Sequence, residues 1–473
     1  MKRKWVWVVL VAALLCCVGG AAGAEEGNIT WTFDESTGEL VIGGSGAMED
    51  YGTVYGHDAP WQAYAEVITK ATVEPGVTTL GDYAFDSCTN LAELSLPDTV
   101  TAIGQYAFAH CQSLTGITIP RDVTSIGVYA FWDCPGLTSI TLPAAVASIG
   151  ECAFSGTYNL AEIRVDAQNP YFASGDGVLF SKDFTTLIAY PRAKGAEHYI
   201  IPGNVTHIGD YAFYECADLR NVSIPNGVIS IGKDAFAHCY KLADLTLPDA
   251  LISIGQAAFV DCVGLVNVEI PAGVKSIGRS AFSGCVNLAS ITIPDGMTRI
   301  EAWTFNDCLN LTDITLSEGI TSIGERAFYY CESLSAITLP GSITAIEEGA
   351  FDECISLTSL TIPGSVTSLE QGVFSGCSAL SNLTISDGVI SIGVSAFSGC
   401  KSLTSVTIPD SVTSMAYASF AFCNNLTNVW IPASVTSIDS GAFTFSKNVT
   451  IQCPPNSYAK QYAIDNDIPY LIR

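Results

Sequence analysis

The sequence predicts a solenoid in which short parallel strands and short helical turns stack in fifteen repeats of 23 residues, closed by a cap at each end. Two observations predict this fold: a seven-residue apolar pattern that recurs at an offset of 23, and a phenylalanine that keeps the same spacing along most of the chain. A unit this short cannot bury its own apolar side chains, so it must share a core with its neighbours.

The first 24 residues have the layout of a secretory signal peptide. A basic start at residues 2–4 precedes an apolar run that is short for a membrane span, and Ala22-Gly23-Ala24 forms an A-x-A cleavage signal. Cysteines at 16–17 raise the alternative of a lipoprotein, but leucines at 14–15 stand where small residues should precede the acylated cysteine. Cleavage near Ala24 is therefore expected, with the mature protein secreted or held at the cell surface.

The net charge is strongly negative, with 20 basic residues against 47 acidic ones and a formal charge of −27. Removal of residues 1–24 would leave only 17 basic residues. A surface of this sign repels phosphate backbones and anionic membranes. Nucleic acid is therefore not expected as a partner, and no later segment is long and apolar enough to predict a transmembrane span.

Residues 25–66 differ from the repeats and are predicted to form an N-terminal cap. Apolar residues alternate over residues 29–33 and 40–42, on either side of a turn at residues 34–38, which predicts a β-hairpin. Ala59-Pro60-Trp61 then leads into the first repeat. A solenoid needs such a cover because an open end would expose an apolar edge.

The repeats occupy residues 67–452. The segment from Leu91 to Pro97 matches the segment from Leu114 to Pro120, and the phenylalanines follow in register: Phe85, Phe108, Phe131, Phe154, then Phe213 to Phe443 in steps of 23. In Leu-x-x-Ile-x-Ile-Pro the apolar residues alternate as in a strand with one buried face. Val-x-x-Ile-Gly is a second extended piece, and in x-x-Ala-Phe-x-x-Cys the spacing of three places Phe and Cys on one helical turn, facing inward.

The complete unit, L-x-x-I-x-I-P-x-x-V-x-x-I-G-x-x-A-F-x-x-C-x-x, resembles the BspA-type leucine-rich repeat of bacterial surface and secreted proteins. The resemblance covers roughly residues 67–452. It implies a right-handed leucine-rich-repeat solenoid and a role in adhesion to host proteins, mucosal surfaces or other bacteria. The family has no catalytic residues to transfer, and its binding residues differ between members.

Two segments interrupt or end the repeats. Residues 166–200 fill the 59-residue gap between Phe154 and Phe213 and are expected to form strands joined by tight turns, either as an elaboration of the stack or as a protruding recognition element. Residues 453–473 are predicted to be a C-terminal cap, with a short helix over residues 457–466 and a final strand over residues 469–472.

Fifteen cysteines follow residue 24, and most occupy one position of the repeat. An exported chain raises the possibility of disulfides. Equivalent side chains on neighbouring turns point in parallel, however, which does not favour a bridge. Cysteine also behaves as a small buried apolar residue. A ladder of reduced interior thiols is therefore expected rather than disulfides, and the one-sided ladder offers no metal site.

Two exposed columns are candidate binding surfaces. The first strand presents a column rich in threonine, which either reflects β-propensity or forms a hydroxylated strip that docks a protein or glycan. It is interrupted by Arg164, Glu269 and Trp430. The second column, before Ala-Phe, is aromatic and either packs turn on turn or anchors a partner. Its members, with the adjacent Trp132, are Tyr83, Tyr106, Tyr129, Tyr211 and Trp303.

The sequence predicts no catalytic, cofactor or metal site: G-x-S-x-G, H-E-x-x-H and G-x-x-x-x-G-K-[ST] are all absent, and the chain has five histidines. The leading hypothesis is a secreted or cell-surface binding protein, an adhesin or interaction module for host or microbial macromolecules, and not an enzyme. The alternatives are a scaffolding component of the cell envelope and, more distantly, an accessory to extracellular glycan or protein degradation.

Overall fold

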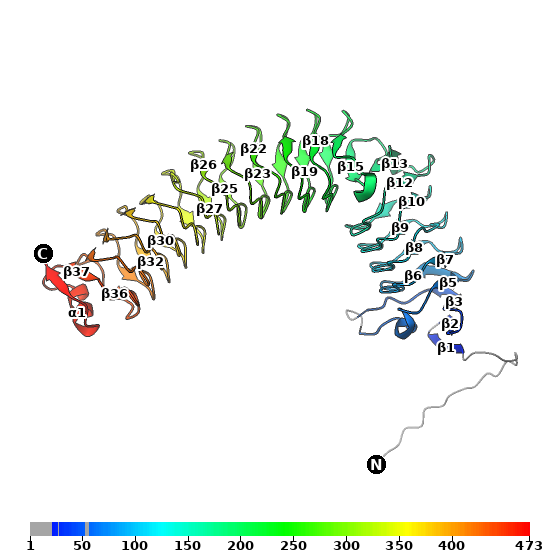
Figure 1. The fold of residues 1–473 in the computed structure, drawn as a ribbon, viewed down its shortest axis with the longest axis horizontal. Coiled ribbons are helices and arrows are strands. Elements are labelled where there is room, and N and C mark those ends of the chain that lie inside the picture. The colour runs from blue at the N-terminus through cyan, green and yellow to red at the C-terminus, as the bar shows by residue number, and fades with distance from the viewer. Residues whose placement is uncertain (1–20, 27, 53–55) are drawn as a thin grey trace, which may run out of the picture. The chain divides into compact units, whose positions relative to one another are not determined.

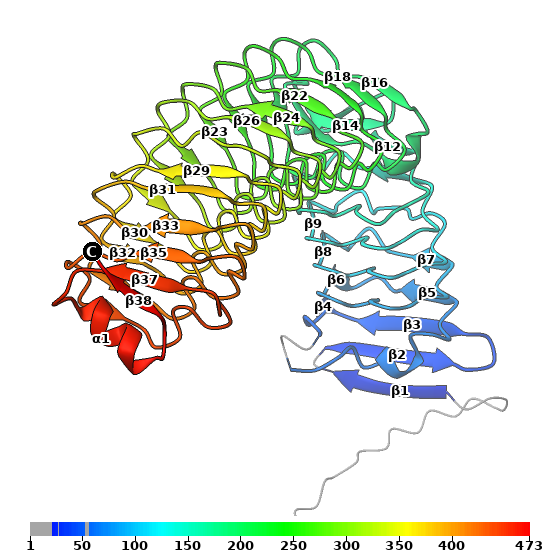
Figure 2. The same cartoon turned by 60° about the vertical axis from the view of Figure 1, so that its left-hand side comes forward.

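The computed structural model describes residues 21–26, 28–52 and 56–473. The described residues form two compact units, one of those up to residue 137 together with 148–154 and the other of residues 138–147 with 155–473. In each unit, turns of the chain stack so that equivalent strands of successive turns lie side by side (Figures 1 and 2). The predicted leucine-rich-repeat solenoid is confirmed.

The first strand of each turn comes from the Leu-x-x-Ile-x-Ile segment, and neighbouring strands pair in parallel, as where Val222 lies beside Leu245. In the first unit these strands are β3 (Glu39–Gly44), β5 (Lys70–Val73) and β7 (Glu93–Ser95). In the second unit they are β10 (Ser139–Leu142), β12 (Glu162–Val165), β16 (His198–Ile200), β18 (Asn221–Ser223), β20 (Asp244–Thr246), β22 (Asn267–Glu269), β24 (Ser290–Thr292), β26 (Asp313–Thr315), β29 (Ser359–Ile362), β31 (Asn382–Ile385), β33 (Ser405–Thr407), β35 (Asn428–Trp430), β37 (Thr450–Cys453) and β38 (Tyr470–Ile472).

The second strand of each turn is shorter and comes from Val-x-x-Ile, as where Ile231 lies beside Ile254. In the first unit these strands are β4 (Gly46–Ala47), β6 (Val77–Leu80), β8 (Ala102–Ile103), β9 (Ser125–Ile126) and β11 (Ser148–Ile149). In the second unit they are β15 (Thr186–Ala189), β17 (His207–Ile208), β19 (Ser230–Ile231), β21 (Ser253–Ile254), β23 (Ser276–Ile277), β25 (Arg299–Ile300), β27 (Ser322–Ile323), β28 (Ala345–Ile346), β30 (Ser368–Leu369), β32 (Ser391–Ile392), β34 (Ser414–Met415) and β36 (Ser437–Ile438).

The segment from the second strand to the cysteine is a run of tight turns and not a continuous helix. The N–H of Cys88 donates to the carbonyl of Phe85 at 3.1 Å, so these two residues share one turn, as their spacing of three predicts. Tyr83 and Ser87 in the same segment have φ of 58° and 61°. Residues in this left-handed region interrupt a right-handed helix, and the two positions are left-handed in nearly every repeat.

The left-handed residues allow alternate N–H groups to point along the stack. Three N–H groups of one turn donate to carbonyls of the next at 2.8–2.9 Å: Tyr83 to Gln105, Phe85 to Ala107 and Ser87 to Ala109. The N–H groups between them donate within their own turn. This segment is therefore a third hydrogen-bonded face of the stack, in addition to the two columns of strands.

Phenylalanine fills the centre of every repeat. Within each unit, successive rings of the fifteen phenylalanines stack with centroids 4.8–6.0 Å apart and interplanar angles of 6–18°. All but Phe154 are buried. A column of rings at this spacing continues the core from one turn to the next without a gap.

Thirteen of the fifteen phenylalanines have a cysteine three residues later, and each of these cysteines is buried and free, which confirms the interior position of the ladder. The thiol also has a hydrogen-bonding role. In eleven repeats its Sγ donates to the phenylalanine carbonyl of the preceding turn at 3.0–3.6 Å, for example from Cys285 to Phe259. In the last repeat Ser446 replaces cysteine, and its Oγ donates to Phe420 at 2.7 Å. This position of the repeat therefore requires a small side chain that can donate a hydrogen bond.

The stack has about 18 turns, slightly more than the fifteen phenylalanine repeats. Three other aromatic residues extend the phenylalanine columns. Trp61 lies 6.2 Å from Phe85, Tyr190 lies 5.1 Å from Phe213, and Tyr462 lies 6.3 Å from Phe443. A count of phenylalanines misses these turns because each one uses a different ring.

The N-terminal cap is an antiparallel sheet that continues into the stack. β1 (Ala21–Glu26) pairs with β2 (Ile29–Asp34), β2 pairs with β3, and β3 pairs in parallel with β5. The 3₁₀ helix η1 (Gln62–Tyr64) follows Trp61, whose Nε1 donates to the Ala84 carbonyl at 2.7 Å. The predicted signal peptide lies outside the described residues except for residues 21–24, which belong to β1.

The segment between Phe154 and Phe213 contains a hairpin and an additional turn of the stack. β13 (Phe172–Gly175) and β14 (Val178–Ser181) pair antiparallel around Asp176-Gly177, whose φ values of 49° and 74° suit a tight hairpin turn. β14 continues to β15, which pairs in parallel with β17 and so returns the chain to the stack. The second 3₁₀ helix, η2 (Arg192–Lys194), leads to β16.

The C-terminal cap consists of the helix α1 (Tyr458–Asp465) and β38. Ser457 caps α1 by accepting a hydrogen bond from the N–H of Lys460 at 3.3 Å. Ala459, Tyr462 and Ala463 are buried, whereas Tyr458, which the sequence places on the same side as Tyr462, is 46% exposed. β38 pairs in parallel with β37 and ends the sheet.

Gly255, which follows the second strand β21, lies very close to the backbone of the preceding turn. A Cβ on Gly255 would lie 2.5 Å from the carbonyl carbon and oxygen of Gly232. Backbone atoms cannot move aside as a flexible side chain can, so we expect Gly255→Ala to lower the free energy of unfolding by about 1–3 kcal/mol. Urea unfolding followed by circular dichroism measures this change. An unchanged midpoint would show that the turns are less closely packed.

Candidate binding surface

Two positions of the repeat place side chains on the outside of the tight turns. The first left-handed column is the residue two before phenylalanine, and the second left-handed column is the residue immediately before cysteine or its replacement. The first column contains the aromatic residues singled out in the sequence. The second contains His110, His238, Tyr330, Phe422 and Phe445, among others.

Four residues of the first unit form an N-terminal aromatic surface: Tyr83, Tyr106, Tyr129 and Trp132. Tyr106 stacks on Tyr83 with a centroid distance of 4.8 Å, and on Tyr129 with one of 5.0 Å. Trp132 meets Tyr106 and Tyr129 edge-on at 6.1 and 5.8 Å. The indole of Trp132 remains 37% exposed. The tyrosine rings therefore pack turn on turn, as the first of the two sequence-based interpretations holds, and the anchoring of a partner stays a prediction.

The rim of the N-terminal aromatic surface contains acidic groups and a histidine. The ring of His110 lies 4.6 Å from that of Trp132, and its Nδ1 is 3.1 Å from a carboxylate oxygen of Asp133. Burial raises the pKa of Asp86 above its usual value, although Ser87 donates a hydrogen bond to its carboxylate at 3.1 Å. Burial also raises the pKa of Tyr83. The surface could accept a flat apolar group or a cation, which an aromatic face attracts.

Tyr211 and Trp303 lie in the second unit, four turns apart, and do not form one site. Lys233 Nζ lies 5.0 Å above the ring of Tyr211. The guanidinium of Arg326 lies 5.0 Å above the ring of Trp303. Each aromatic residue is therefore covered in part by a cation of the following turn, and less of its face is open to a partner.

Arg164, Glu269 and Trp430 are also separate from one another. Arg164 lies on β12 and forms an ion pair with Glu162 of the same strand. Glu269 is exposed at the end of β22, and Trp430 is half-buried at the end of β35, seven turns further along. At a strand spacing of about 4.8 Å, seven turns exceed the reach of a single small ligand.

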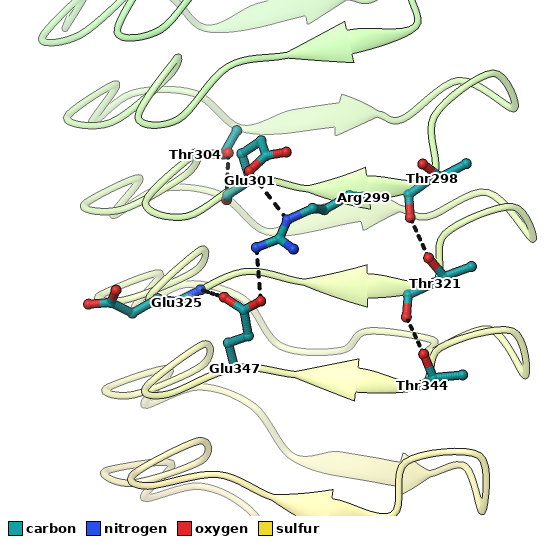
Figure 3. A network of polar contacts seen from close by, with 8 residues as sticks. All are labelled: Thr298, Arg299, Glu301, Thr304, Thr321, Glu325, Thr344 and Glu347. Carbon is teal, nitrogen blue, oxygen red and sulfur yellow. Dashed lines mark hydrogen bonds and ion pairs between the residues drawn. The ribbon is translucent and has the colours of Figure 1, made fainter.

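The threonines of the solenoid have two different roles. In the turn before the second strand, the hydroxyl of Thr321 donates to the carbonyl of Thr298 at 3.0 Å, and that of Thr344 donates to Thr321 at 3.2 Å (Figure 3). These side chains join neighbouring turns. The threonines at the ends of the first strands, such as Thr292 and Thr315, are exposed and face solvent.

A polar cluster around Arg299 is closed on itself (Figure 3). Arg299 Nη2 donates to Glu347 Oε1 at 2.8 Å, two turns along the stack, and its Nε lies 3.3 Å from Glu301. The second carboxylate oxygen of Glu347 accepts a hydrogen bond from the N–H of Glu325 at 3.0 Å. Because its charges already pair with one another, this cluster is a structural link between turns rather than an open site.

Sequence reasoning missed the second left-handed column as a source of exposed aromatic residues. Phe422 is 47% exposed and Phe445 is 59% exposed, and their rings stack at 4.7 Å. The sequence does show that both phenylalanines occupy the same position of the repeat, directly before Cys423 and Ser446. It could not be interpreted without knowing that this position is left-handed and faces outward.

Residues 21–26, 28–52 and 56–473 contain neither a metal-binding cluster nor a membrane-spanning helix. In those ranges no three or more His, Cys, Asp or Glu side chains gather in an arrangement that could hold a metal ion. No helix in the same ranges has the length and apolar character needed to cross a membrane.

A family model matches most of the chain. The BspA type leucine rich repeat region, a unit of six copies, matches residues 63–175, 190–310, 252–381 and 367–467. No curated protein matches the chain significantly.

Several solved structures are similar to this chain. A leucine-rich repeat protein from Eubacterium ventriosum is 29% identical, covers 71% of this chain and 95% of its own, and has a TM-score of 0.64. A leucine-rich cell-surface protein from Faecalibacterium prausnitzii is 26% identical, covers 63% and 98%, and has a TM-score of 0.40. The pneumococcal vaccine antigen PcpA is 21% identical, covers 70% and 95%, and has a TM-score of 0.47. The first of these supports the fold.

The carboxyl group of Asp86 predicts a pH-dependent stability. Because burial raises its pKa in the folded chain, folding favours the protonated acid, and stability falls as the pH rises through that pKa. We expect Asp86→Asn to be more stable than the parent chain at pH 7 and equally stable below the ordinary pKa of an aspartic acid. Thermal unfolding between pH 3 and 7 measures the difference.

Asp183 provides a control, because its pKa is shifted in the opposite direction to that of Asp86. Hydrogen bonds from Ser181 and Thr185 lower its pKa to about 2, so its contribution is present at neutral pH and is lost as the pH falls through that value. Asp183→Asn should therefore be less stable than the parent chain at pH 7. If both asparagine variants changed stability in the same direction at pH 7, the assignment of Asp86 would be wrong.

Proposed function

Because this chain belongs to the family of BspA type leucine-rich repeat proteins, we propose that it is a secreted or cell-surface protein that binds another macromolecule through the exposed side chains of its turns. The partner is a protein or a glycan of host or microbial origin, and the role is that of an adhesin or interaction module without catalysis.

The recurring and the variable positions of the repeat have different roles, and this difference supports the proposal. The residues that recur every 23 positions, such as Phe259, Cys262 and Leu265, are fully buried. They stabilise the stack and are not available to a partner. Recognition must therefore come from the positions that vary between turns, and among these the left-handed columns contain several large aromatic side chains.

The observation that carries the proposal is the N-terminal aromatic surface. Three tyrosines in successive turns occupy a left-handed position, where a residue other than glycine costs roughly 1–2 kcal/mol. Trp132 covers two of these rings and keeps its indole partly exposed. Tyrosine and tryptophan held in this way are typical anchors of binding interfaces because they lose little conformational entropy when a partner covers them.

The proposed export is supported by the sequence of the N-terminal segment, and the proposed lack of catalysis is supported by the chemistry of the buried thiols. The charged and apolar layout of residues 1–24 supports cleavage near Ala24 and passage out of the cell. A net charge of −27 disfavours nucleic acid as the partner. Burial raises the pKa of Cys134 to about 12, and thiols in this environment are poor nucleophiles.

The proposal predicts saturable binding of the mature chain, residues 25–473, to a component of an array of mucosal proteins, matrix proteins and glycans. We expect Trp132→Ala to weaken this binding by about tenfold or more, because an interface anchor of this type contributes at least ~1.4 kcal/mol. Surface plasmon resonance with the ligand found on the array measures the change.

Tyr458→Ala is the matched control, since Tyr458 is an exposed aromatic residue of the C-terminal cap and lies outside the N-terminal aromatic surface. It should bind as the parent chain does. Circular dichroism establishes that both variants fold. A mature chain that binds no component of the array would contradict the proposed function. If Trp132→Ala bound the ligand as tightly as the parent chain does, the N-terminal aromatic surface would not be the binding site.

A further inference from the structure

A shallow groove crosses the turns of the second unit near its C-terminal end. Its volume is about 370 Å³, within the range of small-ligand sites. It lies over the second left-handed column, at the turns that contain Gly376 and Gly399. The residues that line it are Glu353, Ile355, Ser375, Gly376, Ser378, Ser398, Gly399, Lys401, Phe422 and Asn424.

The groove exists because two successive turns have no side chain in the second left-handed column. Gly376 and Gly399 occupy the column with φ of 70° and 75°, between Glu353 on one side and Phe422 on the other. Three turn spacings, about 14 Å, separate the backbones of Glu353 and Phe422. The Glu353 carboxylate lies over Gly376, 2.6 Å from the position of a Cβ there, so the open length of the groove is shorter and centres on Gly399. That length suits one sugar ring or one extended side chain.

The floor of the groove is fixed before any ligand arrives. The N–H of Gly376 donates to the carbonyl of Ser398 at 2.7 Å, and the N–H of Gly399 donates to that of Ala421 at 2.8 Å. These bonds belong to the hydrogen-bonded face that joins all the turns. A ligand would therefore meet a preformed surface and would not need to order a loop.

One end of the groove is an aromatic wall. Phe422 stacks on Phe445 through one face, at 4.7 Å and 21° between the ring planes. The ring also lines the groove, and the preceding turn has Gly399 at this position and so no side chain there that could stack on it. Left-handed phenylalanine is a clear outlier, and here it leaves an apolar ring 47% exposed at a polar groove.

The polar groups of the groove are available for hydrogen bonding. Over the described parts of the chain, the Glu353 carboxylate, the Lys401 ammonium and the Asn424 side-chain amide have no internal hydrogen bond or ion pair. By contrast, the hydroxyl of Ser378 already donates to the Ile355 carbonyl at 3.3 Å. The groove thus offers one strong acceptor and two donors beside the aromatic wall.

The charges of the groove are balanced. Lys401 is the only basic residue between Arg326 and Lys447 in the sequence, and it lies in the groove together with Glu353. One positive and one negative group give no net attraction to an anion or a cation. They do favour a neutral ligand whose hydroxyl groups can donate to the carboxylate and accept from the ammonium.

We propose that this groove binds a neutral hexose of a glycan. The apolar C–H face of the sugar ring lies on the free face of Phe422, and its hydroxyl groups bond to Glu353, Lys401 and Asn424. A sugar ring is the neutral ligand that combines one apolar face with several hydroxyls. The inference names a ligand class for the proposed binding function but uses a different site from the N-terminal aromatic surface.

The expected affinity is low, because a single hexose has few atoms and the groove is shallow. A ligand of this size reaches a Kd of about 1 mM in such a site. The suitable measurement is therefore saturation-transfer NMR on the mature chain. The probes are the methyl glycosides of glucose, galactose, mannose and N-acetylglucosamine, compared with glucuronic acid and with N-acetyl-arginine amide.

The variants separate the groove from the rest of the fold. Phe422→Ala removes the aromatic wall, and Gly399→Asn fills the floor with a residue that tolerates a left-handed φ. Gly284→Asn is the control, since Gly284 occupies the same column five turns earlier with φ of 72°. The new side chain there must displace the Asp261 carboxylate, which lies 2.1 Å from the position of a Cβ. Circular dichroism confirms that each variant folds.

We expect at least one methyl glycoside to bind, with a loss of about tenfold or more in Phe422→Ala and Gly399→Asn and no change in Gly284→Asn. Binding of glucuronic acid or the arginine amide in place of the neutral sugars would overturn the inference, as would no binding of any probe or full binding by Gly399→Asn. A failure here leaves array binding that depends on Trp132 untouched, so it is distinguishable from failure of the proposed function.

Discussion

Hydrogen bonding between the backbones of successive turns is the constraint on which the rest of the structure depends. Strands form two of the hydrogen-bonded faces, as where Ile231 lies beside Ile254. The third face requires left-handed residues, such as Tyr83 and Ser87, so that alternate N–H groups point to the next turn. Because every turn must repeat this pattern at the same spacing, the interior must be filled by the same side chains each time. Phenylalanine provides the volume, and cysteine provides a small side chain whose thiol donates to a buried carbonyl.

This constraint also determines where variation can occur. A turn can change its left-handed residues without altering the stack, provided that the backbone conformation is kept. The first column accordingly changes from Tyr106 to Arg326 and then to Gly372, while the phenylalanines beside these positions keep their places. A stacked aromatic surface in one part of the chain and a glycine-floored groove in another therefore arise from the same repeat. Both are consequences of side-chain choice at positions that contribute little to the core.

Much of the fold follows from the sequence because its signals are periodic. The spacing of Phe85 and Phe108 predicts the length of the turn, and the alternation in Leu-x-x-Ile-x-Ile predicts the strands. The third face could not be predicted, since tyrosine and phenylalanine rarely adopt the left-handed conformation and nothing local indicates it. The turn built on Tyr190 was missed because it uses a different ring. The exposure of Phe422 likewise depends on contacts with neighbouring turns, which no single repeat contains.

The central claim is that the recurring residues occupy a shared interior and leave only the variable ones exposed. The fifteen cysteines from Cys88 to Cys453, thirteen of which occupy the recurring position, report on this directly, because all are buried and burial raises the pKa of Cys88, for example, to about 12. Titration of the native mature chain with a thiol reagent at pH 8 is the most direct measurement. We expect no thiol to react until denaturant is added, and all fifteen then to react together. Rapid reaction of several thiols in the folded chain would contradict it.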